Sequence, residues 1–260
     1  KELILARDRF GIKPLYYFVN EEDCFFASEL NSILSFPIKR KLNYNALSNY
    51  FRFSYISDNE SIIEGISQLK PGKWMRIDEN TITEEHYYSI DTSRLDITYN
   101  EALSEIKKQL EQSVERRLLA DVPLATFLSS GIDSTIISKI ASQKSPNIHS
   151  YSAGFSEFPY FDESKMAKRW AEKNSIDHSI INLSQRELIE SVDELLNGLS
   201  EPFADSSAIA YHALSKQVSK KVKVVLSGDG ADELFGGYQK DKAEWLLREK
   251  PLIRKIAGTF

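Results

Sequence analysis

Short apolar runs separated by turn residues make up the first third of the chain. The runs are rich in β-branched and aromatic side chains, which is typical of strands. They cover residues 3–6, 15–19, 24–27, 73–77 and 86–90. Two short helices are predicted at residues 29–34 and 44–51, and Asn43 precedes the second as its N-cap. The pattern predicts a small β-rich domain.

A different pattern begins after a polar break at residues 91–96. Thr98 and Glu101 have the spacing of a capping box, in which each side chain satisfies an exposed amide at the start of a helix. Apolar residues then recur at spacings of three and four, which gives the helix one apolar face. These residues are Leu103, Ile106, Leu110, Val114 and Leu118.

Strands and helices alternate along the rest of the chain. Nearly continuous apolar runs are typical of strands in a parallel sheet that is covered on both faces. The runs cover residues 123–128, 148–155, 178–183 and 221–226. Ser184 and Glu187 form a second capping box in one of the intervening helical stretches. We therefore predict an α/β fold, with a β-rich part over residues 1–92 and a parallel-sheet domain over residues 93–260.

Composition and charge restrict the classes of function. The 260 residues include 33 Lys and Arg and 38 Asp and Glu, which gives a formal net charge of −5. This balance argues against a dedicated nucleic-acid binder, which usually has a basic face. No apolar run approaches the roughly 20 residues needed to span a bilayer, and the single cysteine, Cys24, fits a reducing compartment. We expect a cytoplasmic protein with no nucleic-acid or membrane partner.

A loop of small polar residues follows the first apolar run of the second half. Residues 127–135 read Phe-Leu-Ser-Ser-Gly-Ile-Asp-Ser-Thr and lead from a strand into an apolar helix. Amides at the N-terminus of a helix carry partial positive charge and favour an anion such as phosphate. Gly131 allows close backbone approach, and the hydroxyl groups add donors. Asp133 would repel phosphate unless a cation lies between them, and Mg²⁺ prefers one or two carboxylates plus phosphate oxygens.

A second loop, at residues 227–238, follows the last strand-like run. It carries three carboxylates within five residues, Asp229, Asp232 and Glu233, bounded by four glycines. Such acidic density is unfavourable unless the carboxylates bind a metal or a cationic group. Ligands of open α/β sheets bind outside the carboxyl ends of the strands. Both loops are expected there, so one nucleotide phosphate chain would touch both.

Two common nucleotide-binding motifs are absent. A Walker loop needs Gly-Lys followed by Ser or Thr, but Gly72 and Lys73 are followed by Trp74. A dinucleotide fingerprint starts at Gly228, but Glu233 occupies its third glycine position. A charged side chain there would obstruct helix–strand packing and repel pyrophosphate.

At these two loops the sequence resembles the glutamine-dependent asparagine synthetase family. That family belongs to the ATP pyrophosphatases, whose loop reads S-G-G-x-D-S, and residues 129–134 match it except that Ser130 replaces the first glycine. Residues 227–238 match the family's S-G-[E/D]-G-x-D-E-x-F-G-G-Y throughout. Residues 201–207 also look like a family segment, and residues 7–17 and 26–30 look like the end of its glutaminase domain. The resemblance therefore covers nearly the whole chain.

The resemblance implies a fold and an activity. The expected fold is the end of an Ntn-hydrolase-type glutaminase domain, followed by the first part of an adenine nucleotide α-hydrolase-like ATP pyrophosphatase domain. The expected enzyme is a ligase of asparagine biosynthesis that uses ATP and Mg²⁺. It activates aspartate as β-aspartyl-AMP, and ammonia from glutamine then displaces AMP. The resemblance leaves a homodimer open.

The chain starts inside a strand-like run without an initiator methionine and stops after an amphipathic stretch. We therefore expect an internal piece of a longer protein. The glutaminase nucleophile of the family is a cysteine at the mature N-terminus, which precedes this sequence. The piece alone is accordingly expected to make no asparagine.

The resemblance also implies roles for individual residues. Asp229 takes the position where many members carry a glutamate that acts on the adenylate and the amine, and aspartate is one methylene shorter. Asp133 and Asp232 would hold Mg²⁺. The residues expected at the pyrophosphate of ATP are Ser129, Ser130, Gly131, Ser134 and Thr135. The residues expected to line the adenosine are Phe127, Leu128, Ala153, Ser227 and Gly228.

Other interpretations stay open at this point. A relative with the same adenylating chemistry would act on another carboxylate, such as a polysaccharide sugar acid, a β-lactam precursor or a peptide. A nucleotide-binding module without turnover is a further alternative. Structural roles are expected for several polar residues: Arg7 with Asp8 in the glutaminase sheet, Cys24 as a core thiol, and Asp162 with Glu163 at a helix start.

Overall fold

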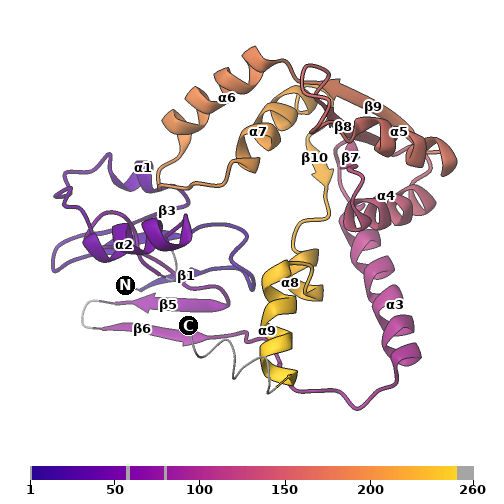
Figure 1. Cartoon of the computed structure of the whole chain (residues 1–260). Coiled ribbons are helices and arrows are strands. Elements are labelled where there is room, and N and C mark those ends of the chain that lie inside the picture. The colour runs from indigo at the N-terminus through magenta and orange to yellow at the C-terminus, as the bar shows by residue number, and fades with distance from the viewer. Residues whose placement is uncertain (1, 57–58, 79–80, 251–260) are drawn as a thin grey trace. The chain divides into compact units, whose positions relative to one another are not determined.

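The computed structural model describes residues 2–56, 59–78 and 81–250. The chain forms two compact units, shown with their elements in Figure 1. One unit comprises Lys1–Asp96 with Val192–Ala208, and the other comprises Ile97–Ser191 with Ile209–Phe260. These units describe packing, and the division into domains between residues 92 and 93 remains a prediction.

The first unit contains two antiparallel sheets of three strands each, in the orders β1-β5-β6 and β3-β2-β4. The strands are β1 (Leu3–Ala6), β2 (Tyr16–Val19), β3 (Cys24–Ala27), β4 (Ile66–Gln68), β5 (Lys73–Ile77) and β6 (Ile82–His86). The helices are α1 (Leu30–Ile33) and α2 (Tyr44–Phe53). The Asn43 side chain accepts hydrogen bonds from the amides of Asn45 and Ala46, which confirms the predicted cap of α2.

The strand predicted at residues 86–90 is wrong. The strand that pairs with β5 is β6, which ends at His86, and the short strand β4 was not predicted. Glutamates at positions 84 and 85 lower the β-propensity of β6, but its pairing with β5 outweighs that preference. Beyond the strand, the amides of Tyr87 and Tyr88 donate to the Gly72 carbonyl, which holds the chain in a bend.

Arg7 and Asp8 have the structural role expected of them, and each binds backbone. The Asp8 carboxylate accepts from the amides of Phe10, Ile12 and Lys13 at 2.9–3.1 Å. The Arg7 guanidinium donates to the carbonyls of Gly11, Lys13 and Leu69. Together the two side chains fix the turn at residues 8–13.

The second unit is built on a four-stranded parallel sheet, as predicted. Its strands are β7 (Leu124–Phe127), β8 (His149–Gly154), β9 (Asp177–Asn182) and β10 (Val224–Leu226). Their order is β10-β7-β8-β9. The chain therefore proceeds from β7 to β9 in one direction and then crosses to the other side of β7. This reversal makes the edge between β7 and β10 the topological switch point, where α/β sheets bind ligands.

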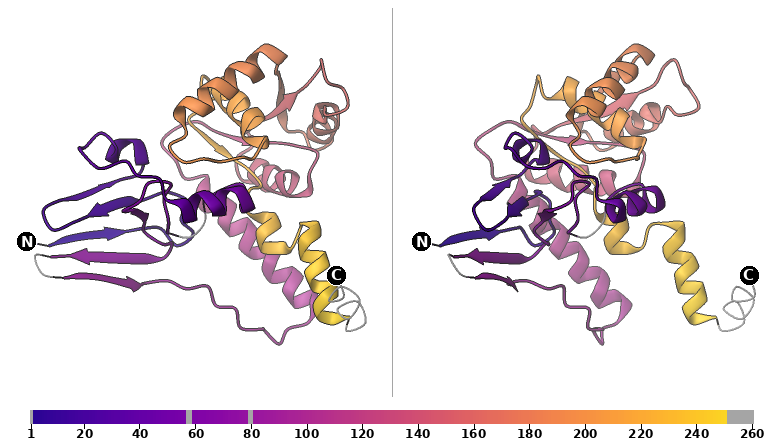
Figure 2. Two further views of the ribbon diagram at one scale, coloured as in Figure 1. Left: turned by 60° about the vertical axis from the view of Figure 1, so that its left-hand side comes forward. Right: turned by 90° about the vertical axis from the view of Figure 1, so that its left-hand side faces the viewer.

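Helices cover both faces of this sheet (Figure 2). The helices of this part of the chain are α3 (Tyr99–Arg117), α4 (Ile132–Lys144), α5 (Ser164–Lys173), α6 (Gln185–Gly198), α7 (Ser207–Val218), α8 (Ala231–Phe235) and α9 (Gln239–Glu249). Helix α7 and the start of α6 pack on one face of the sheet, and α3 and α4 pack on the other. Successive strand residues point to opposite faces. Ala125 belongs to a cluster with Leu214 and Val218 of α7, whereas Leu124 packs with Val114 of α3 and Ile140 of α4.

Both predicted capping boxes are present. The amide of Thr98 donates to the Glu101 carboxylate at 2.8 Å, and the amide of Glu101 donates to the Thr98 hydroxyl. Ser184 and Glu187 exchange the same pair of bonds at the start of α6. Within the described residues, no helix combines the length and the apolar character needed to cross a membrane.

Candidate functional site

The loop after β7 is held by its own serine hydroxyls. The Ser134 hydroxyl accepts from the Ser129 amide at 3.1 Å and lies 2.8 Å from the Ser129 hydroxyl. The Ser129 hydroxyl in turn accepts from the Gly131 amide at 3.0 Å. This closed turn ends at the N-terminus of α4, where the first amides have no partner within the helix and favour an anion.

The loop after β10 carries the acidic residues. The Ser227 hydroxyl donates to the Asp229 carboxylate at 2.7 Å, and Gly230 at φ +89° starts the short helix α8. Gly228 lies against the first turn of α4, because an added β-carbon there would come within 2.8 Å of the Ser134 amide nitrogen. The two loops therefore meet at the switch point.

A cavity of about 520 Å³ opens between these loops within the second unit. Its walls come from β7 and β8, from the loops after β7 and β10, and from helices α4, α5, α7 and α8. Eleven of the thirteen residues to which the resemblance assigns a role line it: Phe127, Leu128, Ser129, Gly131, Asp133, Ser134, Ala153, Ser227, Gly228, Asp229 and Asp232. The structure thus brings most of the predicted site residues into one cavity.

Ser130 and Thr135 are not among the residues that line this cavity. The Ser130 hydroxyl donates to the Glu163 carboxylate, and the Thr135 hydroxyl donates to the Ile132 carbonyl at 2.6 Å. Their expected role at the pyrophosphate stays a prediction. A cap of α5 was expected from Asp162 and Glu163 together. The Asp162 carboxylate accepts from the Ser164 amide at 3.0 Å, whereas Glu163 makes no capping bond with its side chain and lines the cavity instead.

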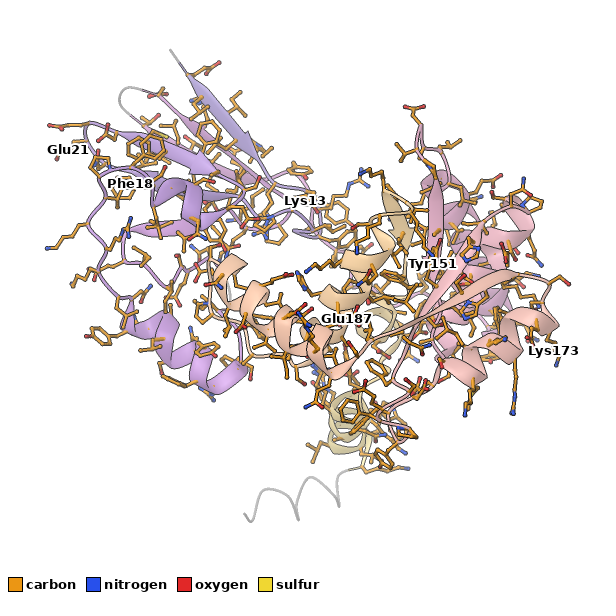
Figure 3. The ribbon with its side chains drawn as sticks, turned by 90° about the horizontal axis from the view of Figure 1, so that it is seen from above. Lys13, Phe18, Glu21, Tyr151, Lys173 and Glu187 are labelled. Carbon is orange, nitrogen blue, oxygen red and sulfur yellow. The ribbon has the colours of Figure 1, made fainter. Side chains whose placement is uncertain are left out.

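Sequence reasoning missed several aromatic residues of the cavity wall. Tyr151 of β8, labelled in Figure 3, is 5% exposed and lines the cavity. Tyr211 of α7 donates to the Asp229 carboxylate at 3.4 Å, and its ring meets that of Phe127 edge-on. No local motif marks Tyr211, because its neighbours read as an ordinary apolar helix.

The tyrosines of the site have perturbed acidities. Burial raises the pKa of Tyr211, and the negative charge of Asp229 adds to the shift. Tyr238 donates to the Glu233 carboxylate at 2.6 Å, which raises the pKa of Tyr238 to about 12 and lowers that of Glu233. Both phenols are therefore hydrogen-bond donors at neutral pH.

Asp133 and Asp232 line the same cavity. The Asp232 carboxylate lies against Gly237, where a β-carbon would come 1.7 Å from its Oδ1. Among the residues that the structure describes, no group of three His, Cys, Asp or Glu side chains is placed to hold a metal by itself. Two carboxylates do fit Mg²⁺ when phosphate supplies the other oxygens.

Cys24 lies far from this chemistry in sequence and belongs to β3 of the first unit. Burial raises the pKa of the Cys24 thiol, which lowers its thiolate fraction at neutral pH. Cys24 is only partly buried and belongs to none of the hydrophobic core clusters of the described residues, so the core position expected of it is wrong.

Two family models match successive parts of the sequence. The family model described as asparagine synthase matches residues 105–258, and the one described as glutamine amidotransferase domain matches residues 1–88. An asparagine synthetase [glutamine-hydrolyzing] of Bacillus subtilis is 32% identical over 90% of this chain and 37% of its own length. A putative asparagine synthetase of Mycobacterium bovis is 34% identical over 98% of this chain and 41% of its own.

A third relative has a different name. The amidase chry2 of Gibberella zeae is 29% identical over 95% of this chain and 39% of its own length. The chain thus spans about two fifths of the curated relatives that it matches. The asparagine synthase model alone covers more than half of the chain and includes both loops of the cavity. By these matches, the chain belongs to the asparagine synthase family.

Proposed function

We propose that the protein containing this chain is a glutamine-dependent ligase that activates a carboxylate with ATP and converts it to an amide. The observation that carries the proposal is the single cavity shared by the loop after β7 and the acidic loop after β10. A helix N-terminus on one side suits phosphate, and carboxylates on the other suit a cation or an amine.

The proposed reaction has two steps. A carboxylate oxygen of the acceptor attacks the α-phosphorus of ATP, and pyrophosphate leaves. Ammonia then attacks the carbonyl carbon of the acyl-adenylate, AMP leaves with the former carboxylate oxygen, and the nitrogen loses a proton. Adenylation is needed because a free carboxylate repels nucleophiles and would have to expel oxide.

The cavity residues divide between these tasks. The backbone of the loop at residues 129–135 would hold the pyrophosphate portion of ATP, and Phe127, Leu128 and Ala153 would contact adenosine. Asp133 and Asp232 would hold Mg²⁺, which neutralises phosphate charge when bound. Asp229 would face the carbonyl and the amine, since it lies in the loop after β10 and lines the same cavity as the phosphate loop.

We propose aspartate as the acceptor and glutamine as the ammonia source. The names of the two synthetase relatives and the match of a glutamine amidotransferase model to residues 1–88 support this choice. The similarity to amidase chry2 supports the second candidate, an amidotransferase acting on another carboxylate.

Exchange of labelled pyrophosphate into ATP tests the proposal in the full-length natural protein. L-Aspartate should stimulate exchange, and sugar acids and peptides should not. Stimulation by a different carboxylate would move the assignment to the second candidate. If the protein binds ATP but none of the tested carboxylates stimulates exchange, it is a nucleotide-binding module and the proposal fails.

A further inference from the structure

Tyr211 reaches the acidic loop from outside both sequence motifs. It lies on α7, and its hydroxyl donates to Asp229 Oδ2 at 3.4 Å. The Ser227 hydroxyl donates to the same oxygen at 2.7 Å. Two hydroxyls from different elements therefore converge on one oxygen of Asp229.

The ring of Tyr211 is fixed independently of that bond. It packs edge-to-face on Phe127, with centroids 5.4 Å apart and planes at 84°. Phe127 is the last residue of β7, so the phenol is anchored to the strand that leads into the phosphate loop. Edge-to-face aromatic pairs have preferred geometries, which limits movement of the hydroxyl.

We propose that Tyr211 is a positioning residue, whose hydroxyl holds the Asp229 carboxylate toward the reacting carbonyl. This inference rests on the proposed function, since it assigns Tyr211 to that same site. A carboxylate on a loop can rotate about two side-chain bonds. Two donors on Oδ2 hold that oxygen in place and leave Oδ1 for the amine that attacks the adenylate.

The 3.4 Å separation is long for a hydroxyl–carboxylate bond. Catalytic hydrogen bonds are often long without substrate and tighten in the complex. Tyr211 therefore contributes most during turnover, and its loss should lower kcat more than it changes the KM for ATP.

The kinetic test uses Tyr211→Phe in the full-length natural protein, because this change keeps the ring on Phe127 and removes only the hydroxyl. The kcat of amide formation should fall about tenfold, as expected for a misplaced catalytic group. The KM for ATP should change less than about twofold, because the adenosine contacts remain. A lower kcat/KM that comes only from a higher KM for ATP, with kcat unchanged, would overturn the inference.

Tyr160→Phe is the matched control. Tyr160 also meets a phenylalanine edge-on, Phe161 at 5.1 Å and 87°, but it is 92% exposed and does not line the cavity. Its variant should keep wild-type kcat. In an Asp229→Ala background, Tyr211→Phe should have no further effect on residual activity, because no carboxylate remains to be held. Additive losses would contradict the inference.

A measurement without turnover separates this inference from the proposed function. In protein labelled with ¹³C at tyrosine Cζ, the Tyr211 signal is assigned by its loss in Tyr211→Phe. Asp229→Ala should shift that signal in the absence of any substrate. An unchanged signal would show that the contact is absent. If the signal shifts but none of the tested carboxylates stimulates pyrophosphate exchange, the contact between Tyr211 and Asp229 is present. Its assigned catalytic purpose is then overturned.

Discussion

The backbone of Gly228 lies directly against Asp133, so that a β-carbon at Gly228 would come within 2.8 Å of the Asp133 Cβ. This contact joins the loop after β10 to the first turn of α4. It therefore sets the distance between the acidic loop and the helix N-terminus that we assign to phosphate.

Gly228→Ala should weaken nucleotide binding by pushing these two loops apart. Forcing a methyl group into a packed site costs about 1–3 kcal/mol, and each 1.4 kcal/mol is tenfold in affinity. We expect the Kd for ATP, measured by calorimetry, to rise about tenfold.

Gly198→Ala is the control for that change. Gly198 ends α6, and an added β-carbon there meets nothing within 4 Å. Its Kd for ATP should match the wild type. Equal Kd values for the two variants would show that the loops are not held by this contact.

Asp133→Asn and Asp232→Asn should each lower pyrophosphate exchange about 100-fold, by analogy with removal of one electrostatic stabilising group. Each variant should also need more Mg²⁺ for half-maximal exchange. Asp121→Asn, at an exposed position before β7, should keep wild-type Mg²⁺ dependence. Unchanged Mg²⁺ dependence in both cavity variants would refute the shared cation.

Ser129 and Ser130 are adjacent but should respond differently to alanine. Ser129 bonds to Ser134 and Gly131 and so shapes the phosphate loop, whereas Ser130 bonds to Glu163. We expect Ser129→Ala to raise the KM for ATP about tenfold, because the turn loses the bonds of the Ser129 hydroxyl to Ser134 and to the Gly131 amide. Ser130→Ala should raise it less than about twofold. The reverse order would place the nucleotide on the other face of the loop.

Glu201 should make the first unit less stable as pH rises. Burial raises the pKa of Glu201 above its ordinary 4.5, although the amide of Ile62 donates to its carboxylate. A raised carboxyl pKa means that the folded state holds the proton more tightly. The stabilisation that protonated Glu201 gives the folded state is therefore complete below pH 4.5. It is lost as pH rises through the raised pKa of Glu201.

The measurement for Glu201 is the free energy of unfolding of the wild type and of Glu201→Gln as a function of pH. The amide variant has no charge to bury, so its advantage over the wild type should grow from acid pH to neutral pH. A difference that is constant with pH would remove this role for Glu201.

The sequence was sufficient to predict structural features that depend only on residues close together in the chain. The capping boxes at Thr98 and Ser184 and the cap at Asn43 formed because each needs only atoms within a few residues. The apolar runs predicted the parallel sheet, since strands covered on both faces have few polar positions. Strand β6 was missed because its stability comes from pairing with β5 rather than from its own composition.

Some residues of the candidate site could likewise be predicted from a local motif, whereas others could not. Asp229 and Asp232 stand out in the sequence, because they and Glu233 lie within five residues and are bounded by four glycines. Tyr211 could not be found, because its contact with Asp229 depends on β10 lying beside β7 and on the position of α7 over that edge. The sheet order is a long-range property that no local pattern contains.

The central claim is that one nucleotide and one cation occupy the cavity between the two loops. A crystal structure of the full-length natural protein with a non-hydrolysable ATP analogue and Mg²⁺ tests it most directly. We predict phosphate oxygens at the amides of residues 129–135 and a single ion bound by both Asp133 and Asp232. A nucleotide bound elsewhere, or carboxylates that share no ion, would contradict the account.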